Sequence, residues 1–533
     1  MRTLVNEGVD DGSAPPGEGE GGRGSTPWTS RLAPLAPVAV AAVVAVGVVL
    51  RFFSTSELWL DEALSANIAA LPVGDLLDAL RHDGHPPLYY LLLHGWMQVF
   101  GEGDVAVRAL SGVIGLGMLP LAWVAGRRLA GLSGARWALV VAALSPYAIR
   151  YSTETRMYSL VMLLVLAGYL LLTDALREPT GRRLAGLFLL SGLLLLTHYW
   201  SFYLLAAVGL VLLLRWRRRA DDRPATLRVL VAVAAGGVLF LPWLGGFLYQ
   251  AGHTGTPWGE PYRPTEILQT TLNDFGGGLV SEALLGGSVI LIMALVALFA
   301  TRSEGREMTF DVRTAPTVRV ELAVVVLTAA IGCLAGYATS ATYQSRYAAV
   351  FAPLVLLAVA VGITRVPGAA RVVVGGVVVG LSLAGVVWLQ YYQRTQSQVA
   401  ADAVVARAEP GDVVVYCPDQ LGPAYSRALS ADGVVEVSYP DLSAPERVDW
   451  VDYADRNAAT DPTAVAADVR DLADGNGIFV VWMGEYRTVE GQCESLVNAL
   501  GQGEELVRED GKKYYEPANV HWFPAGSGAG AGG

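Results

Sequence analysis

Two adjacent carboxylates follow the first long apolar run of the chain, in the sequence Trp59-Leu60-Asp61-Glu62. At a membrane surface such a pair is suited to positioning or deprotonating an acceptor hydroxyl, or to holding a cation. The alternative is structural, because Asp61 begins an amphipathic stretch and aspartate is a common helix N-cap. Asp61 and Glu62 are therefore candidate catalytic residues, with the capping role left open.

Two histidines occur where an apolar segment meets a loop. His85 lies in the turn DGHPP at residues 83–87, where the prolines end an extended segment and favour the start of a short helix. His198 lies in the sequence THYW at 197–200, between two apolar runs. Both are candidate site residues, and for each a turn histidine without a chemical role is the alternative.

Arginines recur among tyrosines in two further segments, 145–158 and 343–347. Anchoring at the membrane interface explains the tyrosines. An arginine near a bilayer costs a few kcal/mol by insertion scales, so it needs an anionic partner. A structural ion pair and a ligand contact are both open for each arginine. The candidates of this kind are Arg108, Tyr151, Arg156, Tyr158, Arg346 and Tyr347.

The elements that position these residues must be largely membrane-embedded. Of the 533 residues, 53% are hydrophobic and only 16% are charged, whereas soluble domains carry about 25% charged residues. The residues from Arg394 onward hold 10 basic and 23 acidic side chains, a net charge of −13, and the rest of the chain is at +2. This acidity argues against nucleic acid as a partner.

Hydropathy and arginine placement predict eleven membrane spans, with the basic loops on the cytoplasmic side. The segment 87–100 is too short for a span and is expected to form an interfacial or re-entrant helix. The N-terminus is then cytoplasmic, and the candidate residues share the outer face. The predicted spans are 33–53, 107–125, 134–150, 158–176, 184–198, 200–214, 227–248, 282–300, 320–339, 347–364 and 371–391.

We therefore predict a mainly α polytopic membrane protein with a small extracytoplasmic α/β domain. The expected parts are a disordered tail at 1–30, a transmembrane domain at 31–393, the outer domain at 394–523 and a flexible tail at 524–533. In the outer domain, the apolar patterns predict strands at 412–416 and 478–482 and helices at 464–472 and 493–500.

Three cysteines occur, and the spacing of Cys and His residues does not indicate a metal site. Cys333 falls in a predicted span. Cys417 and Cys493 lie in the domain placed outside, where disulfides persist, and both a bridge and two free thiols are open.

Carboxylates and arginines at bilayer depth suit a particular kind of ligand. Carboxylates bind sugar or acceptor hydroxyls, and arginine binds phosphate through two hydrogen bonds. A lipid-linked phosphosugar presents both groups at the interface. No glycine-rich nucleotide-binding pattern occurs in the cytoplasmic loops, which favours a lipid donor over a nucleotide donor.

Several motifs together carry a family resemblance. They are WLDEA (59–63), HPPLYYLLL (85–93), FGEGDVAVRALS (100–111), SPYAIRYSTETRMYSL (145–160) and RY (346–347) followed by Pro353. In this order and spacing they resemble the bacterial membrane glycosyltransferases related to protein O-mannosyltransferases and the lipid A aminoarabinose transferase. Those proteins share the GT-C fold and belong to glycosyltransferase family 39.

The resemblance implies a role for each candidate. Asp61 would be the essential acidic residue with Glu62 as its partner, and the helix after Pro87 would be a juxtamembrane helix of the first outer loop. It also implies inversion at the sugar, and a divalent cation is open, since relatives differ. The implied phosphate ligands are Arg108, Arg156 and Arg346, and the further site residues are His85, Tyr151, Tyr158, His198 and Tyr347.

The predicted activity is transfer of a mannose-like monosaccharide from a polyprenyl-phosphate donor to an acceptor hydroxyl on the extracytoplasmic side. Its partners would be that donor, a protein, lipid or glycan acceptor, and the bilayer. The alternatives are an arabinofuranosyl or other lipid-linked sugar transferase for cell-wall glycans, and a lipid-linked sugar transporter. A transporter should carry polar residues or broken helices at mid-bilayer and detectable repeats, whereas the polar residues here cluster at the outer interface.

Overall fold

The computed structural model describes residues 33–526 except 257, 258, 260, 261, 279, 280, 305, 306, 316, 340 and 485. The predicted disordered tail at 1–30 and residues 527–533 of the predicted flexible tail lie outside these residues. The chain forms two units, 1–39 and 40–533. In the first unit, the described residues form a 3-10 turn at Ala33–Leu35 and the start of an apolar helix, α2 (Ala36–Leu50).

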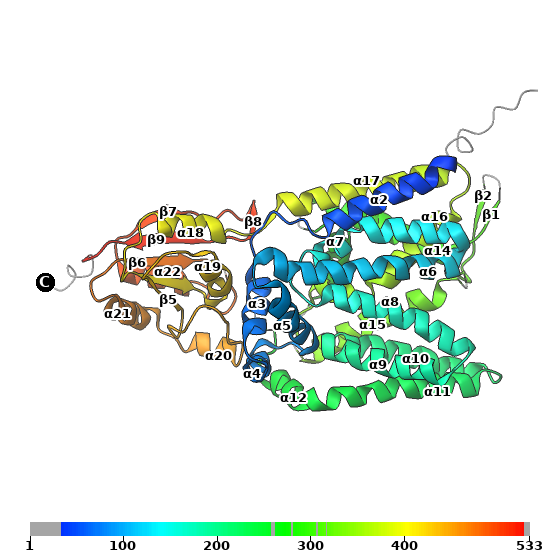
Figure 1. Ribbon diagram of the computed structural model, residues 1–533, viewed down its shortest axis with the longest axis horizontal. Coiled ribbons are helices and arrows are strands. Elements are labelled where there is room, and N and C mark those ends of the chain that lie inside the picture. The colour runs from blue at the N-terminus through cyan, green and yellow to red at the C-terminus, as the bar shows by residue number, and fades with distance from the viewer. Residues whose placement is uncertain are drawn as a thin grey trace, which may run out of the picture. The chain divides into compact units, whose positions relative to one another are not determined.

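Long apolar helices run side by side through the second unit (Figure 1). Two 3-10 segments, η2 (Gly236–Trp243) and η3 (Ser345–Val350), interrupt them. The helices are α6 (Asp104–Leu144), α7 (Pro146–Ser152), α8 (Tyr158–Arg177), α9 (Gly181–Thr197), α10 (Ser201–Arg218), α11 (Arg223–Ala235), α12 (Leu244–His253), α13 (Pro264–Phe275), α14 (Ser281–Phe299), α15 (Arg319–Thr339), α16 (Ala352–Arg365) and α17 (Ala370–Tyr391).

Within the described residues, six helical segments are long and apolar enough to cross a bilayer: 104–144, 158–177, 223–253, 282–299, 319–339 and 370–391. Two shorter apolar helices, α2 and α16, accompany them. A multi-pass membrane protein of mainly α class is therefore confirmed, and the count of eleven spans stays a prediction.

The 41-residue α6 contains two of the predicted spans. Its backbone leaves the helical region at Ala130 and at Gly131, where φ is +64°. A Cβ on Gly126 would lie 2.5 Å from the carbonyl oxygen of Gly134, so the two arms approach each other closely on either side of this turn. The second arm ends at Leu144, before the residue 150 that hydropathy suggested, because α7 begins at Pro146 with the Ser145 hydroxyl as its N-cap.

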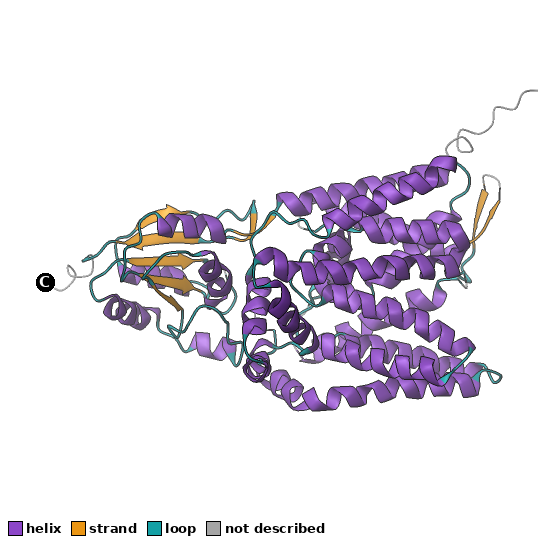
Figure 2. Cartoon of the chain, in the orientation of Figure 1, coloured by secondary structure: helices purple, strands orange, loops and turns teal. Residues whose placement is uncertain are grey.

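Three short helices lie across one end of the bundle (Figures 1 and 2). They are α3 (Leu60–Ala70), α4 (Val73–Asp83) and α5 (Leu88–Phe100). The short helix expected after Pro87 is α5, which buries Tyr89, Tyr90, Leu93 and Met97. This spacing places one face of α5 against the protein.

Beyond these helices lies a five-stranded sheet with the order β5-β4-β6-β9-β7. β4 pairs in parallel with β5 and β6, while β9 runs antiparallel to β6 and β7. The predicted strands at 412–416 and 478–482 are β4 and β6, whose almost entirely buried apolar runs suit central parallel strands. The strands are β4 (Val413–Cys417), β5 (Val435–Ser438), β6 (Ile478–Trp482), β7 (Glu504–Val507) and β9 (Asn519–Phe523).

Helices surround this sheet, and a disulfide joins one of them to the interior strand β4. Cys417 at the end of β4 is bonded to Cys493 in α22, and Cys333 is free. The helices are α18 (Ser397–Val405), α19 (Gly422–Ala428), α20 (Tyr453–Ala458), α21 (Pro462–Ala473) and α22 (Gln492–Leu500). The predicted helices at 464–472 and 493–500 fall within α21 and α22.

A strand pair and an apolar cluster are among the contacts that join the sheet-containing part to the helical bundle. Directly after α17, β3 (Gln393–Thr395) pairs in parallel with β8 (Tyr514–Glu516). A separate apolar cluster packs Trp59 and Leu60, at the start of α3, against Val448, Trp450 and Tyr453. A small hairpin, β1 (Ala300–Glu304) and β2 (Glu307–Phe310), lies at the opposite end of the bundle (Figure 1).

Candidate active site

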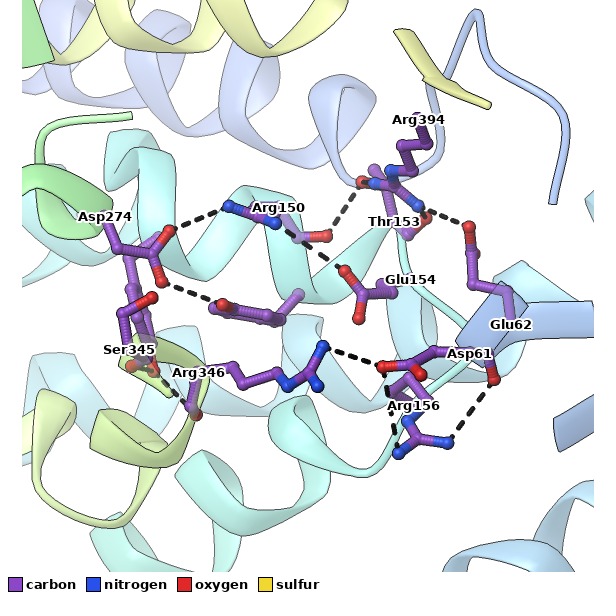
Figure 3. A network of polar contacts seen from close by, with 12 residues as sticks. Asp61, Glu62, Arg150, Thr153, Glu154, Arg156, Asp274, Ser345, Arg346 and Arg394 are labelled. Carbon is purple, nitrogen blue, oxygen red and sulfur yellow. Dashed lines mark hydrogen bonds and ion pairs between the residues drawn. The ribbon is translucent and has the colours of Figure 1, made fainter. Parts of the chain in front are cut away.

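The carboxylate of Asp61 lies beside two arginines from distant segments (Figure 3). Its Oδ2 accepts a hydrogen bond from Nη1 of Arg346 at 2.8 Å and lies 3.9 Å from Nη2 of Arg156. The N-cap of α3 is Trp59, without a side-chain capping hydrogen bond, so Asp61 is not the cap. Its side chain is 14% exposed, and the carboxylate is therefore both charge-compensated and accessible.

The neighbouring carboxylate of Glu62 is fully buried and fully occupied. It accepts hydrogen bonds from Nε and Nη2 of Arg108 at 2.8 and 2.7 Å, from Nη1 of Arg394 at 2.8 Å and from the backbone N–H of Thr155 at 3.0 Å. Burial raises the pKa of Glu62, but the charges and hydrogen bonds of Arg108 and Arg394 outweigh it and lower the pKa to about 2. The two adjacent carboxylates thus have opposite environments.

The arginines around Glu62 also bind backbone and hydroxyl oxygens. Arg108 donates to the carbonyls of Ser56 and Glu57 at 2.6 and 2.8 Å. Arg394, in β3, donates to the carbonyl and to the hydroxyl of Thr153, both at 2.8 Å. Glu62, Arg108, Thr153 and Arg394 therefore connect α3, α6, the segment after α7 and β3, and we call this group the joint at Glu62.

Arg156 is 2% exposed and lies against the turn that carries His85. Its Nη2 is 2.8 Å from Nε2 of His85, and its Nη1 donates to Ser65 Oγ at 3.0 Å and to Tyr90 Oη at 3.2 Å. The other ring nitrogen of His85 is 2.8 Å from a carboxylate oxygen of Asp83. His85 therefore lies between an acid and a guanidinium.

Several aromatic rings lie next to Arg346 in sequence or in space. Tyr347 packs between His198 and Trp200, with ring centroids 5.3 and 5.6 Å away. Burial, together with the nearby guanidiniums of Arg156 and Arg346, holds the pKa of His198 well below its usual value. A neutral imidazole among aromatic rings forms a mixed polar and apolar surface.

A second polar cluster is centred on Asp274. Asp274 in α13 accepts hydrogen bonds from Nη1 of Arg150 at 2.9 Å and from the hydroxyl of Tyr151 at 2.8 Å (Figure 3). The ring of Tyr158 packs 4.8 Å from that of Tyr151. Within the described part of the chain, neither carboxylate oxygen of Glu154 has a hydrogen-bond partner; the nearest cation is Nε of Arg150 at 4.0 Å. Burial raises the pKa of Glu154, against the attraction of Arg394 and Arg150.

A cavity of about 1400 Å³ opens at the end of the bundle that carries the turn at residues 83–86. Tyr199, Trp200, Tyr203 and Phe247 give it an aromatic side. Of the predicted site residues it is lined by Asp61, His85, Arg156, His198, Arg346 and Tyr347. The structure thus brings these six together, whereas Glu62, Arg108, Tyr151 and Tyr158 are buried outside the cavity lining.

Sequence reasoning missed several residues of this network. Asp83, Arg150 and Glu154 lie inside motifs that were recognised, so a signal for them existed. Asp274 and Arg394 lie in segments without a diagnostic motif and reach the network only through folding. In the part of the chain that the structure describes, three or more His, Cys, Asp or Glu side chains do not assemble into a metal site.

Comparisons with known proteins bear on the fold and on part of the sequence. Residues 84–244 match the family model of dolichyl-phosphate-mannose-protein mannosyltransferases. The crystal structure of ArnT from Cupriavidus metallidurans bound to undecaprenyl phosphate superposes with a TM-score of 0.56 at 14% sequence identity, covering 91% of this chain and 97% of that one. The apo structure of the same protein gives 0.58 at 13% identity, covering 91% and 98%. No curated protein sequence matches the chain.

The resemblance deduced from the motifs is therefore confirmed: residues 84–244 match a mannosyltransferase family model, and the chain has the fold of ArnT. The matched residues 84–244 include His85, Arg156 and His198 of the cavity. They do not include Asp61 and Arg346, which the fold brings to the same wall.

Proposed function

We propose that the chain transfers a monosaccharide, mannose-like in its stereochemistry, from a polyprenyl-phosphate donor to an acceptor hydroxyl on the extracytoplasmic side. The observation that carries this proposal is the pairing of Asp61 Oδ2 with Arg346 Nη1 at 2.8 Å on the wall of the large cavity. A carboxylate is a base for a hydroxyl, and a guanidinium is a ligand for a phosphate.

The ion pair of Asp61 with Arg346 suggests how donor binding frees Asp61 to act as a base. A donor phosphate that binds Arg346 competes with Asp61 for the same guanidinium and frees the carboxylate to accept a proton. The acceptor oxygen then forms its bond to the anomeric carbon and gives its proton to Asp61. The bond from that carbon to the phosphate oxygen breaks, and the electron pair stays on the phosphate beside Arg346 and Arg156. Attack from the face opposite the leaving group inverts the anomeric centre.

Glu62 and Arg108 take other roles in this proposal than the motifs suggested. Glu62 accepts four hydrogen bonds and lies outside the cavity, so it cannot also hold an acceptor hydroxyl. Arg108 donates four hydrogen bonds to Glu62 and two backbone carbonyls and lies outside the cavity lining. We assign both residues to the joint that positions Asp61, and we assign the donor phosphate to Arg346 and Arg156.

The helical bundle offers space for a lipid chain. An apolar cavity of about 810 Å³ lies among α8, α9, α10 and α15, with Leu194, Leu204, Val208 and Val324 in its lining. Trp200 and Tyr203, which line the large cavity, also line a smaller pocket together with Gly332 and Tyr337 of α15. ArnT was crystallised bound to undecaprenyl phosphate, and an apolar cavity among the helices supports the same class of donor here.

The distribution of charge supports the proposed orientation. Arginines cluster at the ends of α8, α9 and α10 far from α3 (Figure 1), among them Arg177, Arg182 and Arg215. By the positive-inside rule those ends face the cytoplasm. The cavity, the sheet and the C-terminal part are then extracytoplasmic.

The test is sugar transfer by the purified full-length protein in lipid nanodiscs. The donor is polyprenyl-phosphate mannose with a radiolabelled sugar, and the acceptor is an extract of membranes. Asp61→Asn should abolish transfer while the protein stays folded. The control is Asp174→Asn, which removes a carboxylate paired with Arg128 at 2.9 Å near the far end of α8 and should leave transfer unchanged.

Equal transfer by wild type and Asp61→Asn would refute the role of Asp61. No transfer by the wild type from polyprenyl-phosphate sugars, with mannose and arabinofuranose donors both supplied, would refute the proposed reaction.

A further inference from the structure

The turn at residues 83–85 folds back on itself at the edge of the large cavity. Asp83 ends α4, and Gly84 has φ of +87°, a left-handed conformation that favours glycine. The chain therefore reverses, and the side chain of His85 returns to that of Asp83. From α12, Nε2 of Gln250 donates to the carbonyls of Leu80 and His85 at 2.6 and 3.3 Å, so the turn is held from both sides.

The contacts of His85 determine which of its nitrogens carries the proton. A guanidinium has only hydrogen-bond donors, so Nε2, at 2.8 Å from Nη2 of Arg156, must accept. The proton then lies on Nδ1 and is donated to Asp83 Oδ2, 2.8 Å away. His85 is thus a neutral imidazole whose tautomer is chosen by Asp83.

Asp83 has a second connection to the same arginine. The hydroxyl of Tyr90, in α5, donates to Asp83 Oδ2 at 2.7 Å and accepts from Nη1 of Arg156 at 3.2 Å. Asp83, His85, Arg156 and Tyr90 therefore form a closed ring of four hydrogen bonds. The carboxylate of Asp83 accepts a hydrogen bond from both His85 and Tyr90. Each of these two residues in turn accepts a hydrogen bond from one terminal nitrogen of Arg156.

The ring leaves one hydrogen of Nη2 of Arg156 unused, and Nε has no hydrogen-bond partner among the described residues. Nη1 is taken by Tyr90 Oη and Ser65 Oγ, and Nη2 gives one of its hydrogens to His85. The remaining side of Nη2 faces Asp61 Oδ2 at 3.9 Å, where both residues line the cavity. A long side chain with many rotamers is thereby reduced to one orientation.

We infer that Asp83 and His85 are positioning residues, which orient Arg156 toward the donor phosphate through a neutral, Nδ1-protonated His85 rather than by acid–base chemistry or direct charge. This inference rests on the proposed function, because it assigns the donor phosphate to Arg156. It adds Asp83 to the functional residues and gives His85 a role as an acceptor. Glutamine should therefore replace His85, because its amide oxygen can accept from Arg156 while its NH₂ group donates to Asp83.

Three variants test this ring in the transfer assay, with the KM for donor and the kcat measured separately. His85→Leu removes the acceptor of Nη2 of Arg156, and Asp83→Leu removes the carboxylate that fixes His85 and Tyr90. Both should raise the donor KM about tenfold or more, the effect of losing a hydrogen bond to a buried charged group. His85→Gln should recover most of that loss. Binding of sugar-free polyprenyl phosphate, measured by thermal stabilisation of the protein, should follow the same order without any turnover.

A second histidine–carboxylate pair provides the matched control. His82 Nδ1 lies 2.9 Å from Asp449 Oδ1, both side chains are about half exposed, and neither contacts Arg156. His82→Leu and Asp449→Leu should leave the donor KM and polyprenyl-phosphate binding at the wild-type values.

Each outcome separates the inference from the proposed function. If the wild type transfers sugar and His85→Gln is as impaired as His85→Leu, the histidine acts by its charge or as an acid–base group, and the positioning role is refuted. An unchanged donor KM in Asp83→Leu also refutes it. A wild type that neither transfers sugar nor binds polyprenyl phosphate refutes the proposed function itself.

Discussion

The adjacent carboxylates Asp61 and Glu62 should respond to substitution in opposite ways. Glu62 is fully buried and bonded to two arginines, whereas Asp61 lies on the cavity wall and pairs with Arg346. Removing one partner of a buried ion pair costs about 3–5 kcal/mol, because the other charge stays buried without compensation. Glu62→Ala leaves two guanidiniums in that state, so it should destabilise the protein by at least this amount. Asp61→Asn should abolish transfer with little loss of stability.

The lowered pKa of Glu62 gives the same prediction a pH dependence. A fall from 4.5 to about 2 corresponds to about 3 kcal/mol of stabilisation. Because the folded-state pKa is depressed, this stabilisation is present above pH 4.5 and is lost as the pH falls toward 2. The wild type should therefore lose stability over that window more steeply than Glu62→Gln, which has no carboxylate to protonate.

The assay is the midpoint of thermal unfolding of the detergent-purified protein, followed by tryptophan fluorescence from pH 7 to pH 3, alongside sugar transfer at pH 7. The reasoning would be refuted by a Glu62→Ala protein as stable as the wild type. It would also be refuted if the stabilities of wild type and Glu62→Gln fell in parallel below pH 4.5.

Two further predictions concern the sheet-containing part. Replacing both Cys417 and Cys493 with serine removes a cross-link between residues 76 apart and should lower the free energy of unfolding by about 4 kcal/mol through loop entropy. Thermal unfolding measures this loss. Thiol counting in the unfolded, unreduced wild type should find only Cys333. Burial raises the pKa of Glu516 to about 8, outweighing a hydrogen bond from Thr395. A raised folded-state pKa means that stability falls between pH 4.5 and 8, so Glu516→Gln should be more stable than wild type at pH 8 and nearly equal to it at pH 4; a lower melting temperature at pH 8 would contradict this.

Local sequence carried much of the fold and part of the site. Apolar runs such as 158–176 and 371–391 correspond closely to α8 and α17, because a bilayer demands long apolar helices with internal hydrogen bonds. The motif around His85 and that around Arg156 each placed a residue on the cavity wall. Such motifs are readable because they lie in short segments with fixed local geometry.

The different environments of neighbouring residues could not be predicted from the sequence. Asp61 and Glu62 are adjacent and chemically alike, yet helical geometry turns one toward the cavity and the other into the protein. Arg108 and Arg346 looked equally suited to a phosphate, and their difference depends on which carboxylate each one meets. These pairings are set by tertiary packing between distant segments, which neither hydropathy nor a local motif records.

The partners of Glu62 also set an order of assembly during synthesis. Arg108 follows Glu62 by only 46 residues, whereas Arg394 follows it by 332. At translation rates of about 5–20 residues per second, Glu62 waits roughly 20–70 s for its second guanidinium. The site is therefore completed only after the last membrane helix has emerged, and a nascent chain cut short before β3 would hold Glu62 in an incomplete ion pair.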